Sequence, residues 1–109
     1  PLFSTIGSNG AVTQKSGTVF VTKSGVCAMT LADPVSGSPD AGGDDGKELA
    51  VISTTANAHT LSNAAGSGFN AGGSASDVGT FGGAKGDGIT VVAYGGVWYV
   101  KGKTNVTLA

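Results

Sequence analysis

The sequence predicts an all-β fold: a small antiparallel β-sandwich or β-barrel with long glycine-rich loops and an extended N-terminal arm. Apolar and polar residues alternate with a period of two along several segments rich in β-branched residues, as half-buried strands require. Two of these segments are joined by only Gly95 and Gly96, and glycine adopts the positive φ angles of a two-residue hairpin turn. Glycine, at 20 of 109 residues, also interrupts nearly every stretch long enough to form a helix.

The period-two segments predict a strand in each of seven places, at residues 18–22, 26–31, 47–54, 59–61, 89–94, 97–101 and 105–108. In three of them the alternation also assigns a face to each side chain. Within the first strand Val19 and Val21 lie opposite Phe20, and within the second Cys27, Met29 and Leu31 share one face. Within the third, Leu49, Val51 and Ser53 lie opposite Ala50 and Ile52.

The remaining segments predict an arm and two loops. Residues 1–10 precede the first convincing strand, and Leu2, Phe3 and Ile6 are candidate anchors because free arms are usually disordered. Residues 33–46 and 63–88 are rich in turn residues, and loops of this length are uncommon in compact domains unless they are functional or rest on a partner. We therefore divide the chain into an arm, residues 1–10, and a single β domain, residues 11–109.

The composition excludes several classes of partner. Charged residues form only 12% of the chain, there is no Arg, and the formal net charge is −1. Because Arg supplies the bidentate contacts to phosphates and guanine edges, we expect no nucleic-acid partner. No stretch approaches the roughly 20 apolar residues of a membrane span, and no signal peptide is recognisable, so we expect no membrane partner and synthesis inside a cell.

No pattern predicts catalysis or a cofactor. Cys27 is the only cysteine and lies in an apolar run, which favours a buried, inert thiol. His59 is the only histidine, and one imidazole supplies too few groups for a metal site or a proton relay, so we expect a structural or solvent-facing side chain at a strand edge. Asp40, Asp44 and Asp45 lie among glycines, which suits either a weak calcium site or, as we favour, the turn that leads into the next strand.

Aromatic residues are the best candidates for contact with another molecule. On the last hairpin Trp98 faces one side and Tyr99 the other, so one side is core and the other an interface; the sequence does not assign them. Phe69 and Phe81 lie in the glycine-rich segment and either pin that segment to its own core or insert into a neighbouring molecule.

Residues 45–55 (DGKELAVISTT), 58–61 (AHTL) and 86–100 (GDGITVVAYGGVWYV) resemble small β-rich virion proteins of tailed bacteriophages, of the head decoration (cement) type. The resemblance covers roughly residues 17–108 and rests on the general order and spacing of these motifs. It implies a non-enzymatic structural protein on the capsid surface, made in the bacterial cytoplasm. It also implies the major capsid protein as partner and a homo-oligomer, with a trimer favoured.

A second hypothesis is a phage fibre module that binds a receptor or a glycan, in which tyrosine and tryptophan side chains would stack on sugar rings. Both hypotheses place the function at an interface, with no catalytic, cofactor-binding or metal-binding residue. The candidate interface residues are Leu2, Phe3, Ile6, Phe69, Phe81, Tyr94, Trp98 and Tyr99.

Overall fold

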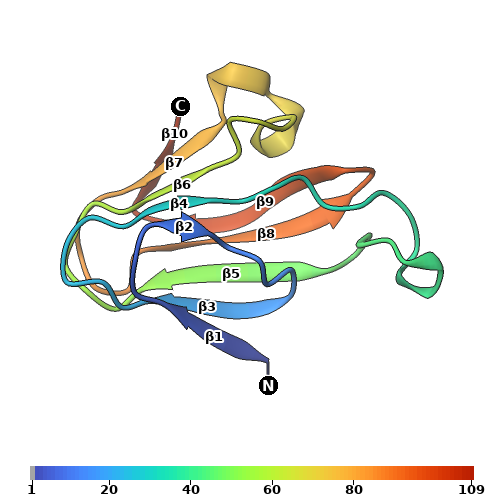
Figure 1. Ribbon diagram of the computed structural model, residues 1–109. Coiled ribbons are helices and arrows are strands. Elements are labelled where there is room, and N and C mark those ends of the chain that lie inside the picture. The colour runs from blue at the N-terminus through green and yellow to red at the C-terminus, as the bar shows by residue number, and fades with distance from the viewer. Residues whose placement is uncertain (1) are drawn as a thin grey trace.

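The computed structural model describes residues 2–109 and shows two β-sheets packed face to face (Figure 1). Sheet A has the strand order β1-β3-β5-β8-β9, formed by Phe3–Ile6, Gly17–Val21, Glu48–Ser53, Gly88–Tyr94 and Val97–Thr104. Sheet B has the order β10-β7-β6-β4-β2, formed by Val106–Leu108, Val78–Phe81, Thr60–Ser62, Ala28–Thr30 and Gly10–Ala11. Three short 3₁₀ turns, η1 (Pro39–Ala41), η2 (Phe69–Ala71) and η3 (Gly73–Ala75), lie in the connections.

The first six strands alternate between the two sheets, so that the chain passes back and forth across the core. As a result β1, β3 and β5 pair in parallel in sheet A, and β2, β4 and β6 pair in parallel in sheet B. The parallel pairs of the two sheets have the same sequence separation: Gly17 pairs with Leu49 in sheet A, and Ala28 pairs with Thr60 in sheet B. From β7 onward all pairing is antiparallel.

The all-β class is confirmed, but the prediction of an antiparallel sheet is wrong for half of the pairs, and both sheets are mixed. The parallel pairs arise from the alternation of β1 to β6 between the sheets. Between two consecutive strands of one sheet the chain passes through a strand of the other sheet, and this strand serves as the crossover connection. The sheets do not close on themselves, so the alternative of a barrel is also wrong.

The core lies between the sheets and follows the predicted alternation. Cys27, Met29 and Leu31 are buried, and so are Leu49 and Val51. The predicted hairpin is also confirmed, because Gly95 (φ 61°) and Gly96 (φ 81°) form a two-residue turn between β8 and β9 with both φ angles positive. Trp98, Phe69 and Phe81 are the largest fully buried side chains.

Two predicted irregular segments contain strands. Phe3–Ile6, expected in an extended arm, form β1 and pair with β3, while Gly10–Ala11 form β2 and pair with β4. Val78–Phe81, expected in a long loop, form β7 between β6 and β10. Each of these strands is short or rich in glycine and small polar residues, which hides the period-two pattern. Among residues 2–109, no helix has the length and apolar character needed to cross a membrane.

Candidate interaction surface

The outward side of sheet A carries several large apolar and aromatic side chains. Because Val19, Val51 and Val91 are buried against sheet B, their alternate neighbours must point away from the core. We call this surface the outer face of sheet A. Its members are Phe3, Thr5, Thr18, Phe20, Glu48, Ala50, Ile52, Thr90, Val92, Tyr94, Val97, Tyr99 and Thr104, with Gly88 and Gly102 in the same rows.

Two aromatic side chains dominate the exposed area of this face. Phe3, on the edge strand β1, is 63% exposed, and Tyr94, at the end of β8 on the other side of β5, is 67% exposed. Phe3 contacts Phe20 edge to face, with 6.1 Å between the ring centroids, so that the two rings form a ridge. Glu48 and Lys101 are paired at 2.9 Å, which leaves this part of the face without net charge.

A hollow lies on the same face, on the side away from the phenylalanine ridge. It has a volume of about 380 Å³ and is lined by Ile52, Gly88, Thr90, Gly102, Lys103 and Thr104, with Gly86 and Ile89. Gly88 and Gly102, in neighbouring strands, both line this hollow, but they differ: a Cβ atom added to Gly88 would lie 2.6 Å from the Val51 carbonyl oxygen. A Cβ atom added to Gly102 would meet nothing within 4 Å, so the space above this residue is open.

Strand β1 gives sheet A an open edge. Leu2 and Ile6 accept hydrogen bonds from the backbone N–H groups of Thr18 and Thr22, at 3.1 and 2.9 Å. In a parallel ladder alternate residues bond to opposite sides, so the backbone N–H and C=O groups of Phe3 and Thr5 point away from β3. An edge of this kind is a template for a strand from another molecule.

The structure separates the eight candidate interface residues into two groups. Phe69, Phe81 and Trp98 are fully buried, so their assignment to an interface is corrected: they fill the space between the sheets. Ile6 is partly buried against the same core. Leu2, Phe3, Tyr94 and Tyr99 are exposed, and the last three share the outer face of sheet A.

Sequence reasoning missed Phe20, Ile52 and Val92 as surface residues. All three are only partly buried and lie on the outer face of sheet A. The signal was present, because the strands at 18–22 and 47–54 carry large apolar residues on both faces, whereas a half-exposed strand carries polar residues on one.

The lone histidine is structural and held in one tautomer. His59 is fully buried; its Nδ1 accepts the backbone N–H of Cys27 at 3.0 Å, and its Nε2 lies 3.1 Å from the Thr55 hydroxyl oxygen. Because the Thr55 hydroxyl donates to the Lys23 carbonyl, its oxygen is left to accept, so the ring proton is on Nε2. Burial lowers the pKa of His59, and burial raises the pKa of the Cys27 thiol, in keeping with the inert thiol predicted from the sequence.

We expect the free energy of unfolding to fall as the pH drops below about 6.5, the ordinary pKa of histidine. The unfolded chain then takes up a proton that the folded chain resists, so stability is complete above this pH and decreases toward the lower pKa of the folded state. One proton gives a slope of at most about 1.4 kcal/mol per pH unit. Denaturant titrations at several pH values measure it, and the His59→Gln variant is the control; an equal slope in that variant would assign the effect to another group.

The acidic loop is a turn, as favoured from the sequence. Asp44 is buried; its carboxylate accepts Lys47 Nζ at 2.8 Å, Lys15 Nζ at 3.1 Å and the backbone N–H of Val35 at 2.7 Å. These contacts lower the pKa of Asp44, with the hydrogen bond from Lys47 as the largest cause. Asp45 accepts the backbone N–H of Gly95 at 2.9 Å, so both carboxylates are committed to protein donors. No group of three or more His, Cys, Asp or Glu side chains in residues 2–109 is placed to hold a metal ion.

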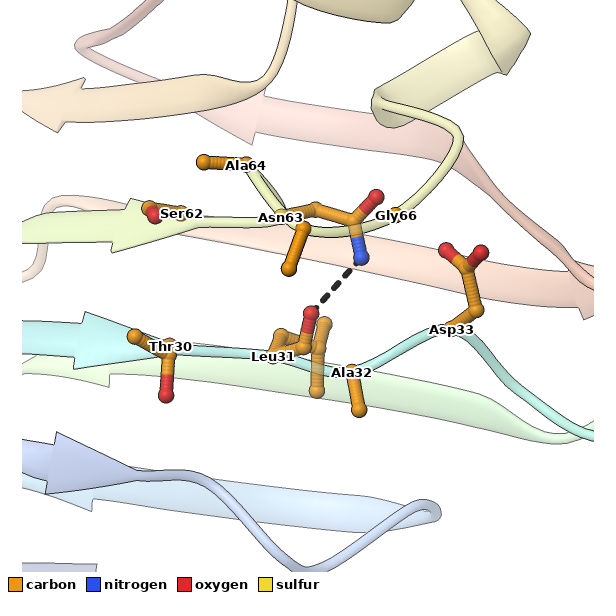
Figure 2. Close-up of a pocket in the computed structure, with 9 residues that line it drawn as sticks. Thr30, Leu31, Ala32, Asp33, Ser62, Asn63, Ala64 and Gly66 are labelled. Atoms are coloured by element: carbon orange, nitrogen blue, oxygen red, sulfur yellow. Dashed lines mark hydrogen bonds between the residues drawn. The ribbon is translucent and has the colours of Figure 1, made fainter.

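A pocket of about 400 Å³ opens where β4 and β6 end, as Figure 2 shows. Its polar groups serve the neighbouring loop: Asn63 donates from Nδ2 to the Leu31 carbonyl at 2.7 Å and accepts the backbone N–H of Gly68 at 2.8 Å. Asp33 accepts from the backbone N–H and the hydroxyl of Ser67, at 3.2 Å each. The hydrogen bonds of Asn63 and Asp33 therefore hold the loop after β6 in place. Small side chains such as Ala32 and Ala64 form much of the wall of the pocket.

Comparisons with protein families, with curated proteins and with solved structures find no match to this chain.

Proposed function

We propose that this protein is a bacteriophage capsid decoration (cement) protein, which binds the outer shell at capsomer junctions and stabilises the head. The observation that carries the proposal is the open edge of β1, beside the exposed side chains of Leu2 and Phe3. An extended segment of the major capsid protein can add to this edge as a further strand of sheet A. Main-chain hydrogen bonds then supply affinity, and the apolar side chains supply contact area.

The mechanism follows from where such a protein binds. A decoration protein spans the contact between neighbouring capsomers, so separating them requires breaking its contacts as well as those of the shell. Because the same site recurs around the head, a modest free energy of binding per copy suffices. The low charge of the chain, 12% of residues, suits many copies that pack side by side without strong mutual repulsion.

The test is a substitution at the open edge that leaves the fold intact. In Thr5→Pro the lost N–H is one that points away from β3, so the ladder with β3 survives while a strand added on the free side loses a donor. We expect at least about tenfold weaker co-sedimentation with undecorated phage heads, about 1.4 kcal/mol of binding free energy. Ser24→Pro, in an exposed bend, is the matched control.

Two results would count against the proposal, and they differ in meaning. If the unaltered chain does not co-sediment with heads, the decoration function itself is wrong. If the chain binds and Thr5→Pro binds equally well, the function stands and the edge of β1 is not the route of attachment. Thermal unfolding of both variants confirms that neither change has disrupted the domain.

The alternative, a fibre module that binds a receptor or glycan, rests on Tyr94 and Tyr99, which are 67% and 39% exposed on one hairpin. Tyrosine rings in such positions can stack on sugars. The burial of Trp98 removes the strongest stacking group from this hypothesis. Copy number per virion distinguishes the two functions, because decoration requires a copy at each repeated shell site and a fibre requires few.

A further inference from the structure

We infer that the outer face of sheet A is a self-complementary surface that pairs with a second copy of this chain about a two-fold axis along β5. The inference concerns the isolated chain and does not depend on the proposed function. It rests on the order of side chains along two neighbouring rows of this face, where large residues at one edge match glycines at the other.

Both rows cross all five strands of the sheet. From β1 to β9 the first row reads Phe3, Thr18, Ala50, Thr90, Gly102, and the second reads Thr5, Phe20, Ile52, Gly88, Thr104. The central strand is β5, with two strands on each side. The two phenylalanines lie on the β1–β3 side and the two glycines on the β8–β9 side.

A half-turn about an axis along β5 places β1 of one copy over β9 of the other, and β3 over β8. Phe3 then faces Gly102 of the second copy, and Phe20 faces Gly88 of the second copy. Threonines face threonines, while Ala50 and Ile52 meet their own equivalents at the axis. The phenylalanine ridge of each copy thereby lies against the hollow of about 380 Å³ in the other, with Phe3 over the open space at Gly102.

The size and charge of the face suit such a pair. Five strands at a spacing of about 4.8 Å and six residues of β5 at about 3.3 Å each give a footprint of roughly 480 Å² per copy. Two copies together bury about 960 Å², which is close to the roughly 1,000 Å² threshold for a biological interface and typical of a weak pair. Each Glu48 carries its own Lys101, so that end of the face is neutral in each copy, and Lys103, which lines the hollow, donates from Nζ to the Val106 carbonyl at 2.9 Å.

This geometry is isologous and closes at two copies. A trimer, which the resemblance to decoration proteins implies, needs a different, head-to-tail contact. Sedimentation equilibrium of the purified full-length chain is therefore the first measurement, and we expect a mass twice that of one chain. A monomer at about 100 µM, or a trimer, would overturn the inference.

Two single substitutions test the pairing of ridge and hollow. Gly102→Lys adds a side chain where the fold has open space and φ is not positive, so the domain folds and the hollow is blocked. Phe3→Glu places a charge on the exposed ridge. We expect each to raise the dimer dissociation constant at least about a hundredfold, because a charge becomes buried without a partner. Gly25→Lys and Val35→Glu, both away from this face, are the matched controls and should dimerise like the unaltered chain.

Mixing the two variants gives the sharpest test. A Phe3→Glu copy paired with a Gly102→Lys copy has one contact with glutamate facing lysine and one unaltered contact of Phe3 with Gly102. We expect the mixture to form mixed pairs at concentrations where each variant alone is monomeric. Within one chain these positions lie at opposite edges of the sheet, so such a rescue requires that the ridge of one copy meets the hollow of another, and a mass of two chains then identifies the contact as two-fold. Single variants that still dimerise, or a mixture that stays monomeric, would exclude this interface.

Discussion

Replacing Trp98 with alanine is expected to remove about 3–5 kcal/mol of unfolding free energy, which is a large part of the roughly 5–15 kcal/mol of an ordinary domain. Trp98 has no exposed surface, and its Nε1–H donates to the Ala32 carbonyl at 2.9 Å. The substitution therefore leaves a cavity between the sheets and an acceptor without its donor. Trp98 is the only tryptophan, so the variant cannot be followed by tryptophan fluorescence. Guanidinium unfolding followed by far-ultraviolet circular dichroism measures the loss instead.

Tyr94→Ala is the control for this prediction. Tyr94 lies on the same hairpin and is also aromatic, but it is 67% exposed, so its removal should cost less than about 1 kcal/mol. Trp98→Phe should fall between the two, since it keeps one buried six-membered ring, leaves a smaller cavity than alanine and loses the hydrogen bond to Ala32. Equal losses for Tyr94→Ala and Trp98→Ala would contradict the assignment of Trp98 to the core.

The second large effect is expected at Asp44. Asp44→Asn removes the negative charge that two lysines share and weakens the acceptor for the backbone N–H of Val35. We expect a loss of about 2–3 kcal/mol, less than for a fully buried ion pair, because Lys15 and Lys47 keep about a third of their side-chain surface in water. Denaturant unfolding at neutral pH measures the loss.

The acid limb of the stability curve provides an independent check on Asp44. Its pKa is lowered in the folded state, so the stability it contributes is present above pH 3.8 and decreases as the pH falls below that value. The Asp44→Asn variant should lose part of this acid dependence. Asp40→Asn, at an exposed position of the same loop, should leave the neutral-pH stability unchanged.

Much of the core could be predicted from the sequence, because alternation is a local property. Residues such as Leu49 and Val51 are buried, and Ala50 and Ile52 lie on the other face, as the period of two requires. The pairing of strands could not be predicted. Whether two strands lie parallel depends on which sheet the chain visits between them, and nothing within a single strand records this.

The interaction surface was only partly predictable for a related reason. The sequence offers Phe3, Tyr94 and Tyr99 as candidate contact residues, and Phe69, Phe81 and Trp98 equally, because alternation alone does not say which of them are buried. The burial of Phe69 and Phe81 depends on where the long segment after β6 folds back over the molecule, which is a tertiary property. The match between Phe20 and Gly88 likewise requires the register across three strands.

The alternation of the first strands between sheets has a mechanical consequence. The N-terminal strands β1 and β2 are the outermost strands of their sheets, whereas β5 and β6 lie at the centres. Tension applied near residue 2 would unzip β1 and then β2, opening hydrogen bonds one after another at low force. The central strands are held by neighbours on both sides, so they yield only when many bonds shear together, and the molecule resists stretching most strongly at its middle.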